Sequence, residues 1–237
     1  MSDTQPLYLP TLQIYASIEC PYAYLATYRL RQVASEYFGR VRLYWRALPL
    51  EYINQKVYPK PQLDQEREMF SQIEPELPFE PWPLEDWQWP TTFWPAFEAL
   101  ACAQAQGMEA TLMYSWALRH AFFAEGRNIS MRHELLAIAE QVAADGYMYF
   151  QRFQNEWDSG RWKNTIVKES WLGWREMQLP RSATFILPNG RWVSNPGLGE
   201  IDFDYEKGVL NSYTPVQGDP LDHYREIFEE TARFHVG

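Results

Sequence analysis

The segment Glu19–Ala26, ECPYAYLA, places a cysteine and a proline between a short apolar run and a stretch with helical spacing. Pro21 suits the first position of a helix, where its missing N–H costs nothing. Cys20 is therefore expected at a helix N-terminus, where the helix dipole and free N–H groups favour an anion. The thiolate is the nucleophilic form of cysteine, so this turn predicts a reactive thiol.

Ala23 stands where a Cys-x-x-Cys motif would carry its second thiol. A dithiol site resolves its own mixed disulfide, whereas Cys20 needs an external thiol, most simply glutathione. Three activities stay open: thiol–disulfide exchange, disulfide shuffling, and activation of glutathione for addition to an electrophile. Glu19 opposes a thiolate, and the first cationic residue downstream is Arg29. The helix dipole is thus the main activator expected, and a buried, inert Cys20 is the alternative.

The elements around this turn follow from hydrophobic periodicity. Residues 12–18 alternate and predict a strand, residues 20–39 have helical spacing, and residues 40–48 alternate again. Residues 74–95 hold many prolines and tryptophans, which predicts a loop packed on helices, with a lid over a site or a docking surface for a partner as the alternative. Further helices are expected over 96–106, 108–125, 130–145, 147–158 and 163–178, followed by strands at 182–187 and 191–194 and a helix from Asp219. The order is β-α-β, a helical insertion, then β-β-α.

Composition limits the function classes. The 237 residues are 46% hydrophobic and carry a net charge of −10, so a folded core is expected and nucleic acid is a poor partner. The first ten residues show no leader pattern, and no apolar run reaches membrane-spanning length. With two cysteines and no disulfide scaffold, a reducing cytoplasm fits best.

The remaining titratable residues favour structural roles. Cys102 lies among alanines and is expected to be a core residue. His133–Glu134 lacks the second histidine of an HExxH motif, so no metal site is predicted. His120 and His133 are expected on insertion helices that could approach the site, but hydrogen-bonded or solvent-facing histidines without a role in the site are favoured. The acidic run 201–208 alternates and predicts a solvated strand face, with contact to the amino group of a bound peptide as the alternative.

Three motifs resemble the DsbA-like group of thioredoxin-fold proteins. CPYAYLA is similar to the CPWCYLG turn of FrnE-like members and to the SPYSYLA-type turn of 2-hydroxychromene-2-carboxylate isomerases and kappa-class glutathione transferases. LRHAFFAEGRNIS (118–130) and SATFILPNGR (182–191) resemble further segments of these relatives. The resemblance implies an α/β thioredoxin-like fold with a large all-helical insertion. It divides the chain into a discontinuous domain, 11–49 and 179–237, and an insertion domain, 50–178.

The resemblance also implies the site. Cys20 is the expected catalytic residue, and the expected substrate-binding residues are Pro21, Tyr22, Ala23, Ser182, Ala183 and Thr184. Ala183 replaces the cis-proline of the family, and because a cis bond before a non-proline residue is costly, a trans Ser182–Ala183 bond is expected.

The activity implied first is a monothiol disulfide oxidoreductase or isomerase, with glutathione as co-substrate and no tightly bound cofactor. A glutathione-dependent transferase or isomerase and a catalytically degenerate binding module are the alternatives. Partners would be glutathione, or protein and small-molecule thiols and disulfides, with no nucleic acid and no membrane. A homodimer stays open.

Overall fold

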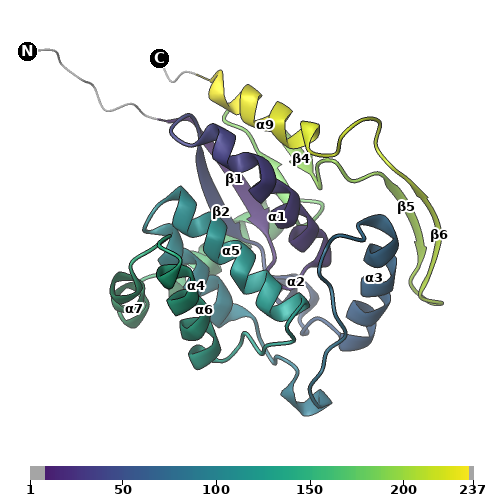
Figure 1. Cartoon of the computed structure of the whole chain (residues 1–237), viewed down its shortest axis with the longest axis horizontal. Coiled ribbons are helices and arrows are strands. Elements are labelled where there is room, and N and C mark those ends of the chain that lie inside the picture. The colour runs from purple at the N-terminus through teal and green to yellow at the C-terminus, as the bar shows by residue number, and fades with distance from the viewer. Residues whose placement is uncertain (1–8, 235–237) are drawn as a thin grey trace, which may run out of the picture.

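The computed structural model describes residues 9–234, and its centre is a four-stranded sheet in the order β2-β1-β3-β4 (Figure 1). β1 runs parallel to β2 and antiparallel to β3, which in turn pairs antiparallel with β4. The predicted βαβ and ββ units are therefore confirmed. The sheet strands are β1 Thr11–Ala16, β2 Arg42–Ala47, β3 Thr184–Ile186 and β4 Trp192–Ser194. Residues 1–8, from which the absence of a leader was predicted, lie outside the described residues.

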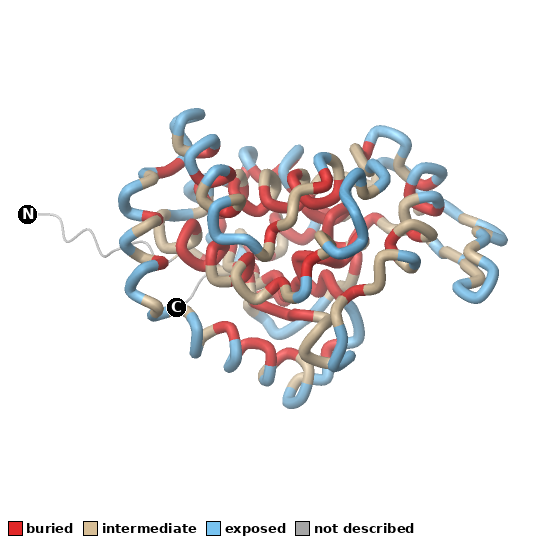
Figure 2. Tube along the Cα trace, turned by 90° about the horizontal axis from the view of Figure 1, so that it is seen from below, coloured by how far each residue is buried: buried red, intermediate tan, exposed pale blue. Residues whose placement is uncertain are grey.

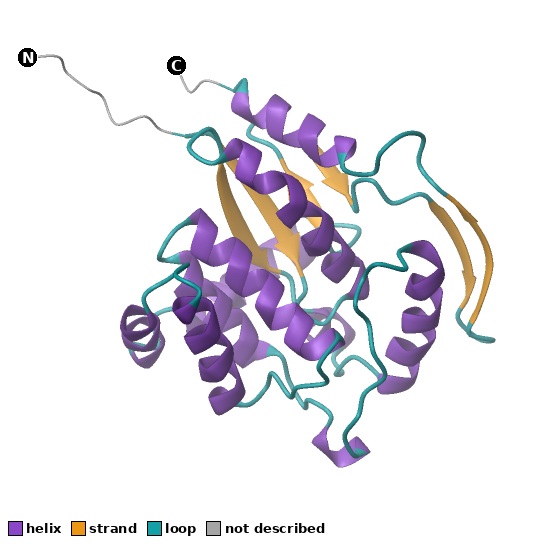
Figure 3. Ribbon diagram, in the orientation of Figure 1, coloured by secondary structure: helices purple, strands orange, loops and turns teal. Residues whose placement is uncertain are grey.

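The helices cover both faces of this sheet, and α1 and α9 lie on the near face in Figure 3. Their bounds are α1 Pro21–Val33, α2 Leu50–Asn54, α3 Lys60–Ile73, α4 Trp94–Gln104, α5 Met108–Phe123, α6 Arg132–Ala144, α7 Phe150–Asp158, α8 Lys163–Trp171 and α9 Asp222–Ala232. Short 3-10 turns occupy Ala34–Tyr37 and Asp86–Gln88, and a π-helical turn, Leu172–Glu176, extends α8. Within residues 9–234, no helix combines the length and the apolar character needed to cross a bilayer.

β1 shows why the sheet is buried on both sides. Leu12, Ile14 and Ala16 belong to the main core beneath α1, as their alternation predicts. Tyr15 points to the opposite face and packs in a second, smaller core with Leu48, Leu179 and Ile186. Figure 2 shows the buried residues in the middle of the molecule and the exposed ones along its outer turns.

The helical insertion packs around aromatic side chains. The proline-rich segment is a loop with one 3-10 turn, as predicted, and its Trp82 and Trp89 rings meet at 4.9 Å and pack near Phe122. Trp87 from the same segment is 80% exposed, so the packing does not include every tryptophan of the loop. The predicted helices correspond to α4–α8 with ends shifted by a few residues.

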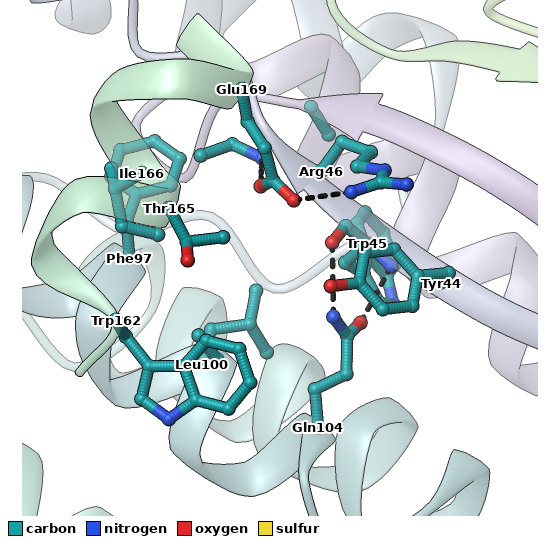
Figure 4. Close-up of a pocket in the computed structure, with 13 residues that line it drawn as sticks. Tyr44, Trp45, Arg46, Phe97, Leu100, Gln104, Trp162, Thr165, Ile166 and Glu169 are labelled. Atoms are coloured by element: carbon teal, nitrogen blue, oxygen red, sulfur yellow. Dashed lines mark hydrogen bonds and ion pairs between the residues drawn. The ribbon is translucent and has the colours of Figure 1, made fainter.

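The outer edge of β2 is closed by side chains from the insertion (Figure 4). Gln104 of α4 accepts a hydrogen bond from the Trp45 N–H at 2.7 Å and donates one to the Trp45 carbonyl at 3.2 Å. Glu169 of α8 accepts the Ala47 N–H at 2.9 Å and pairs with Arg46 at 2.7 Å. These contacts satisfy backbone groups that an unpaired sheet edge would leave open.

Several elements differ from the predicted order, and α2 is among those that were not predicted. α3 was not recognised, because its sequence is dense in charged and polar residues and only Leu63, Met69, Phe70 and Ile73 supply its buried apolar face. Only the first half of the acidic run is a strand. This strand, β5 Glu200–Asp204, pairs with β6 Val209–Thr214 in a separate two-stranded hairpin. This hairpin contacts α3, with Gly208 against Gln65, and stands outside the main sheet (Figure 1).

Candidate active site

Cys20 lies at the N-terminus of α1, as predicted. It is the residue before the first helical turn, Pro21 is the first helical residue, and the Tyr24 N–H donates to the Cys20 carbonyl at 3.0 Å. The residue is only 5% exposed. Cys20 belongs to the main core, which contains residues of the sheet and of the helical insertion. The turn therefore packs between these two parts of the fold.

The Cys20 thiol faces the loop before β3 and donates to the Ser182 carbonyl at 3.5 Å. The Ser182–Ala183 peptide bond in this loop is cis, so the expectation of a trans bond is wrong. The loop is held by residues distant in sequence: the Ala183 N–H donates to Asn195 Oδ1 and the Asn195 N–H to the Ala183 carbonyl, both at 2.9 Å. Ser17 N–H also donates to Ser182 Oγ at 2.7 Å. The Ser182–Ala183 dipeptide by itself does not indicate these contacts from distant residues.

Cys20 opens onto a cavity of about 640 Å³ between α1, α2, α3, the loop before β3 and the β5–β6 hairpin. Of the predicted site residues, Cys20, Tyr22 and Ser182 line it. Pro21, Ala23, Ala183 and Thr184 are buried beside it and do not line it. Thr184 instead bonds the Ser194 hydroxyl at 2.8 Å and donates to the Arg181 carbonyl at 2.7 Å. These four residues therefore position the site.

Burial raises the pKa of the Cys20 thiol to about 12. Hydrogen bonds from the Ala23 N–H and at Ser182 act in the opposite direction, whereas the charges of Glu66 and Glu19 raise the pKa further. The helix N-terminus thus contributes what the sequence predicted, but desolvation outweighs it. At neutral pH the resting residue is a protonated thiol.

Two buried ionisable residues lie beneath the turn: Glu19, which was expected from the sequence to oppose a thiolate, and Arg119, which was not placed in the site from the sequence. Glu19 is fully buried, its Oε1 accepts the Leu50 N–H at 3.0 Å, and burial raises its pKa to about 7. Arg119 of α5 is also fully buried and donates to the Ser17 carbonyl at 3.1 Å and to Ser115 Oγ at 2.7 Å. Burial lowers the Arg119 pKa to about 10, and the charges of Cys20 and Glu19 act in the other direction.

Along the chain, no cationic residue follows Cys20 before Arg29. In the folded protein, Arg119 of α5 supplies a cation beneath the turn. Glu19 Oε2 and Arg119 Nε have no hydrogen-bond partner among the described residues. An arginine in the largely apolar run 118–123 was the available signal, but only packing of α5 on α1 brings it under the turn.

The cavity wall formed by α3 and the hairpin carries a polar network that sequence reasoning also missed. Tyr58 donates to Glu66 Oε2, and Gln62 Nε2 donates to Glu66 Oε1 and to Tyr58 Oη at 3.1 Å each. The Tyr22 and Tyr205 hydroxyls are 3.2 Å apart. Burial raises the pKa of Glu66, while hydrogen bonds from Tyr58, Gln62 and Tyr205 lower it.

The other residues weighed from the sequence lie elsewhere. Cys102 is buried in α4, as predicted, and does not line the cavity. His120 pairs with Glu125 at 3.1 Å and His133 is exposed on α6, so neither reaches Cys20. Across the described part of the chain, no group of His, Cys, Asp and Glu side chains could hold a metal ion.

Comparison with known proteins agrees with this architecture. The model of the DSBA-like thioredoxin domain matches residues 11–171. A putative protein disulfide isomerase from Nitrosomonas europaea superposes with a TM-score of 0.62 at 12% identity, covering 94% of this chain and 97% of that one. The cytosolic disulfide reductase DsbM from Pseudomonas aeruginosa with GSH gives 0.59 at 18% identity, covering 94% and 100%. A 2-hydroxychromene-2-carboxylate isomerase gives 0.54 at 16% identity, covering 78% and 89%.

None of the curated proteins matches the chain. At identities this low, the structural similarity establishes the fold, with its helical content and central sheet.

Proposed function

Because the chain belongs to the DSBA-like thioredoxin domain family, we propose that it is a thiol–disulfide oxidoreductase or isomerase that works through Cys20 with glutathione as co-substrate. The observation that supports this most directly is the position of the Cys20 thiol. It stands at the start of α1, against the Ser182 carbonyl and on a cavity of about 640 Å³, with Ala23 where a second thiol would be.

The chemistry requires two exchanges. The Cys20 sulfur, after losing its proton, attacks one sulfur of a substrate disulfide and releases the other half as a thiolate, which takes up a proton. Glutathione then attacks the substrate sulfur of the mixed disulfide and restores Cys20. The net reaction converts a disulfide and glutathione into a thiol and a glutathione mixed disulfide, with electrons and protons balanced.

The raised pKa of Cys20 determines how the rate of exchange depends on pH. A thiolate with a high pKa is intrinsically a strong nucleophile, but little of it is present at neutral pH. The buried Arg119 and the Ala23 N–H are the groups that favour the thiolate once it forms. We therefore expect exchange that is slow at pH 7 and accelerates steeply as the pH rises.

The compartment and the co-substrate follow from the same proposal. A single thiol without a resolving partner suits a reducing cytosol, where glutathione is abundant. The similarity to the structure of a cytosolic disulfide reductase with GSH supports this choice. A protein or small-molecule disulfide would be the substrate.

A second function is favoured by the protonated state of Cys20. A neutral thiol that donates a hydrogen bond to the sulfur of bound glutathione would act as a serine hydroxyl does, stabilising a glutathione thiolate. Trp174, Phe203 and Ile201 give the cavity apolar area for an electrophile. The similarity to a 2-hydroxychromene-2-carboxylate isomerase supports this transferase or isomerase alternative. If neither activity exists, the chain is a binding module on a catalytic fold.

The deciding experiment compares Cys20→Ser with Cys102→Ser. Purified protein is incubated with glutathione disulfide between pH 7 and 10, and mixed-disulfide formation is followed by intact mass. The wild type and Cys102→Ser should gain one glutathione adduct, faster at higher pH, and glutathione should remove it. Cys20→Ser should gain none at that site. An adduct that persists in Cys20→Ser would place the reactive sulfur elsewhere and refute the proposal.

A further inference from the structure

The cavity wall on α3 and the hairpin is a charged, aromatic surface that the exchange chemistry does not use. Its network joins three parts of the chain: Tyr22 of α1, Tyr58 and Glu66 at α3, and Tyr205 at the turn of the β5–β6 hairpin. The tyrosine at 205 is exposed, whereas Glu66 is 1% exposed. The wall is thus open on one side and anchored by a buried carboxyl group.

Glu66 is the common acceptor of this network. Tyr58 and Gln62 both donate to its carboxyl oxygens. The Tyr22 and Tyr205 hydroxyls pair with each other, and either can be the donor. Each hydroxyl oxygen carries lone pairs, which a ligand group with N–H donors and no acceptor can use.

The charged and aromatic residues of the cavity wall also favour a cationic ligand. Among the described residues that line the cavity, the charged ones are Glu66, Glu200 and Arg181, and only Glu66 is buried. Arg181 and Glu200 are exposed and largely screened by solvent. The rings of Tyr22, Tyr58, Tyr205, Phe203 and Trp174 line the same cavity. Aromatic faces beside a carboxylate attract a cation and disfavour an anion.

We propose that this wall receives an ammonium group, so that the preferred substrates of Cys20 are disulfides or thiols of cationic aminothiols. The proposal rests on the exchange function of Cys20. It adds a substrate class, because the ammonium group supplies three N–H donors to the tyrosine oxygens and a charge that complements Glu66. A cation at this place also offsets the carboxylate that opposes the Cys20 thiolate, so a cationic substrate favours the Cys20 thiolate that attacks it.

The experiment compares disulfides that differ in charge. Cys102→Ser protein is mixed at pH 8 with cystamine, bis(2-hydroxyethyl) disulfide or 3,3′-dithiodipropionate, and the rate of adduct formation at Cys20 is measured by intact mass. The rate at which each disulfide reacts with free 2-mercaptoethanol is measured separately and corrects for the intrinsic reactivity of that disulfide. We expect cystamine to be favoured over the dianion by about tenfold or more after this correction, the size expected of a cation–π contact plus a buried charge. Equal corrected rates would overturn the inference while leaving exchange at Cys20 intact.

The residue assignment is tested by Glu66→Gln against Glu68→Gln, an exposed glutamate of the same helix. Glu66→Gln should remove most of the preference for cystamine, measured as the ratio of its corrected rate to that of the neutral disulfide. Because the charge of Glu66 raises the pKa of Cys20, the rate with the neutral disulfide itself should not fall. Glu68→Gln should keep the preference. An equal loss in both variants would refute the role of Glu66.

A binding measurement separates this inference from the proposed function. If no disulfide reacts, Cys20 is not an exchange nucleophile, and the wall is then tested with unreactive ligands by isothermal titration calorimetry. 2-(Methylthio)ethylamine should bind and 3-(methylthio)propionate should not. Binding of the acid as tightly as the amine, or of neither, would refute the ammonium site.

Discussion

Glu19 and Cys20 are adjacent in the chain, and burial changes the pKa of both side chains in the same direction. Desolvation is the largest cause in each case and raises the pKa to about 7 for Glu19 and about 12 for Cys20. Both groups are therefore held towards their neutral forms by the same enclosure. The hydrogen bond from the Ala23 N–H at the helix N-terminus lowers the pKa of Cys20 but cannot balance the loss of solvent.

The buried carboxyl of Glu19 makes the stability of the fold depend on pH. Its pKa rises from 4.5 to about 7 on folding, so the folded state retains a proton that the unfolded chain loses. This contribution is complete below pH 4.5 and is lost as the pH rises through 7. Glu19→Gln should therefore stabilise the protein by up to about 3 kcal/mol above pH 8, and by much less near pH 4.5.

Urea denaturation at pH 4.5, 6 and 8.5 measures this difference in the free energy of unfolding. Glu140→Gln, an exposed position on α6, is the matched control and should change little at any of these pH values. A benefit of Glu19→Gln that does not vary with pH would mean that Glu19 is not the titrating group.

At the scale of the element, the start of α1 fixes the spacing between Cys20 and Ala23, one helical turn apart. Ala23→Cys in the Cys102→Ser background should therefore form an intramolecular disulfide with Cys20 under mild oxidation. The expected readout is an intact mass lower by two hydrogen atoms and protection of both thiols from alkylation. An oxidised sample that forms only intermolecular dimers would show that this turn does not have dithiol geometry.

Local sequence predicted α1 and β1 well because their determinants are local. Pro21 marks the helix start, and the alternation of Leu12, Ile14 and Ala16 marks the buried face of the strand. The loop at Ser182 could not be predicted in the same way, because Ser17 and Asn195 hold it from 165 and 12 residues away. α3 was missed for a related reason: Glu66 looks like a surface residue until Tyr58 and Gln62 enclose it.

On the scale of the whole molecule, the site depends on segments that meet only in the folded chain. Arg29 of α1 shows how they are joined. Its side chain is 4% exposed, pairs with Glu74 after α3 at 2.6 Å, and donates to the Gly197 carbonyl at 2.6 Å. Gly197 lies two residues after Asn195, the residue that holds the Ala183 loop against Cys20. One guanidinium group thus connects α1, the insertion and the segment that follows the Asn195 contact to the Ala183 loop.

Removing this connection should weaken the fold and the site together. Arg29→Gln leaves Glu74 and the Gly197 carbonyl without their charged partner, and we expect a loss of about 3 kcal/mol in the free energy of unfolding. Arg40→Gln, which breaks an exposed pair with Glu229, is the control and should cost far less. Urea unfolding followed by tryptophan fluorescence and by alkylation of Cys20 should give one shared transition in Arg29→Gln. If the alkylation transition alone moved to lower urea, the site would open independently of the insertion, and Arg29 would not couple the two parts.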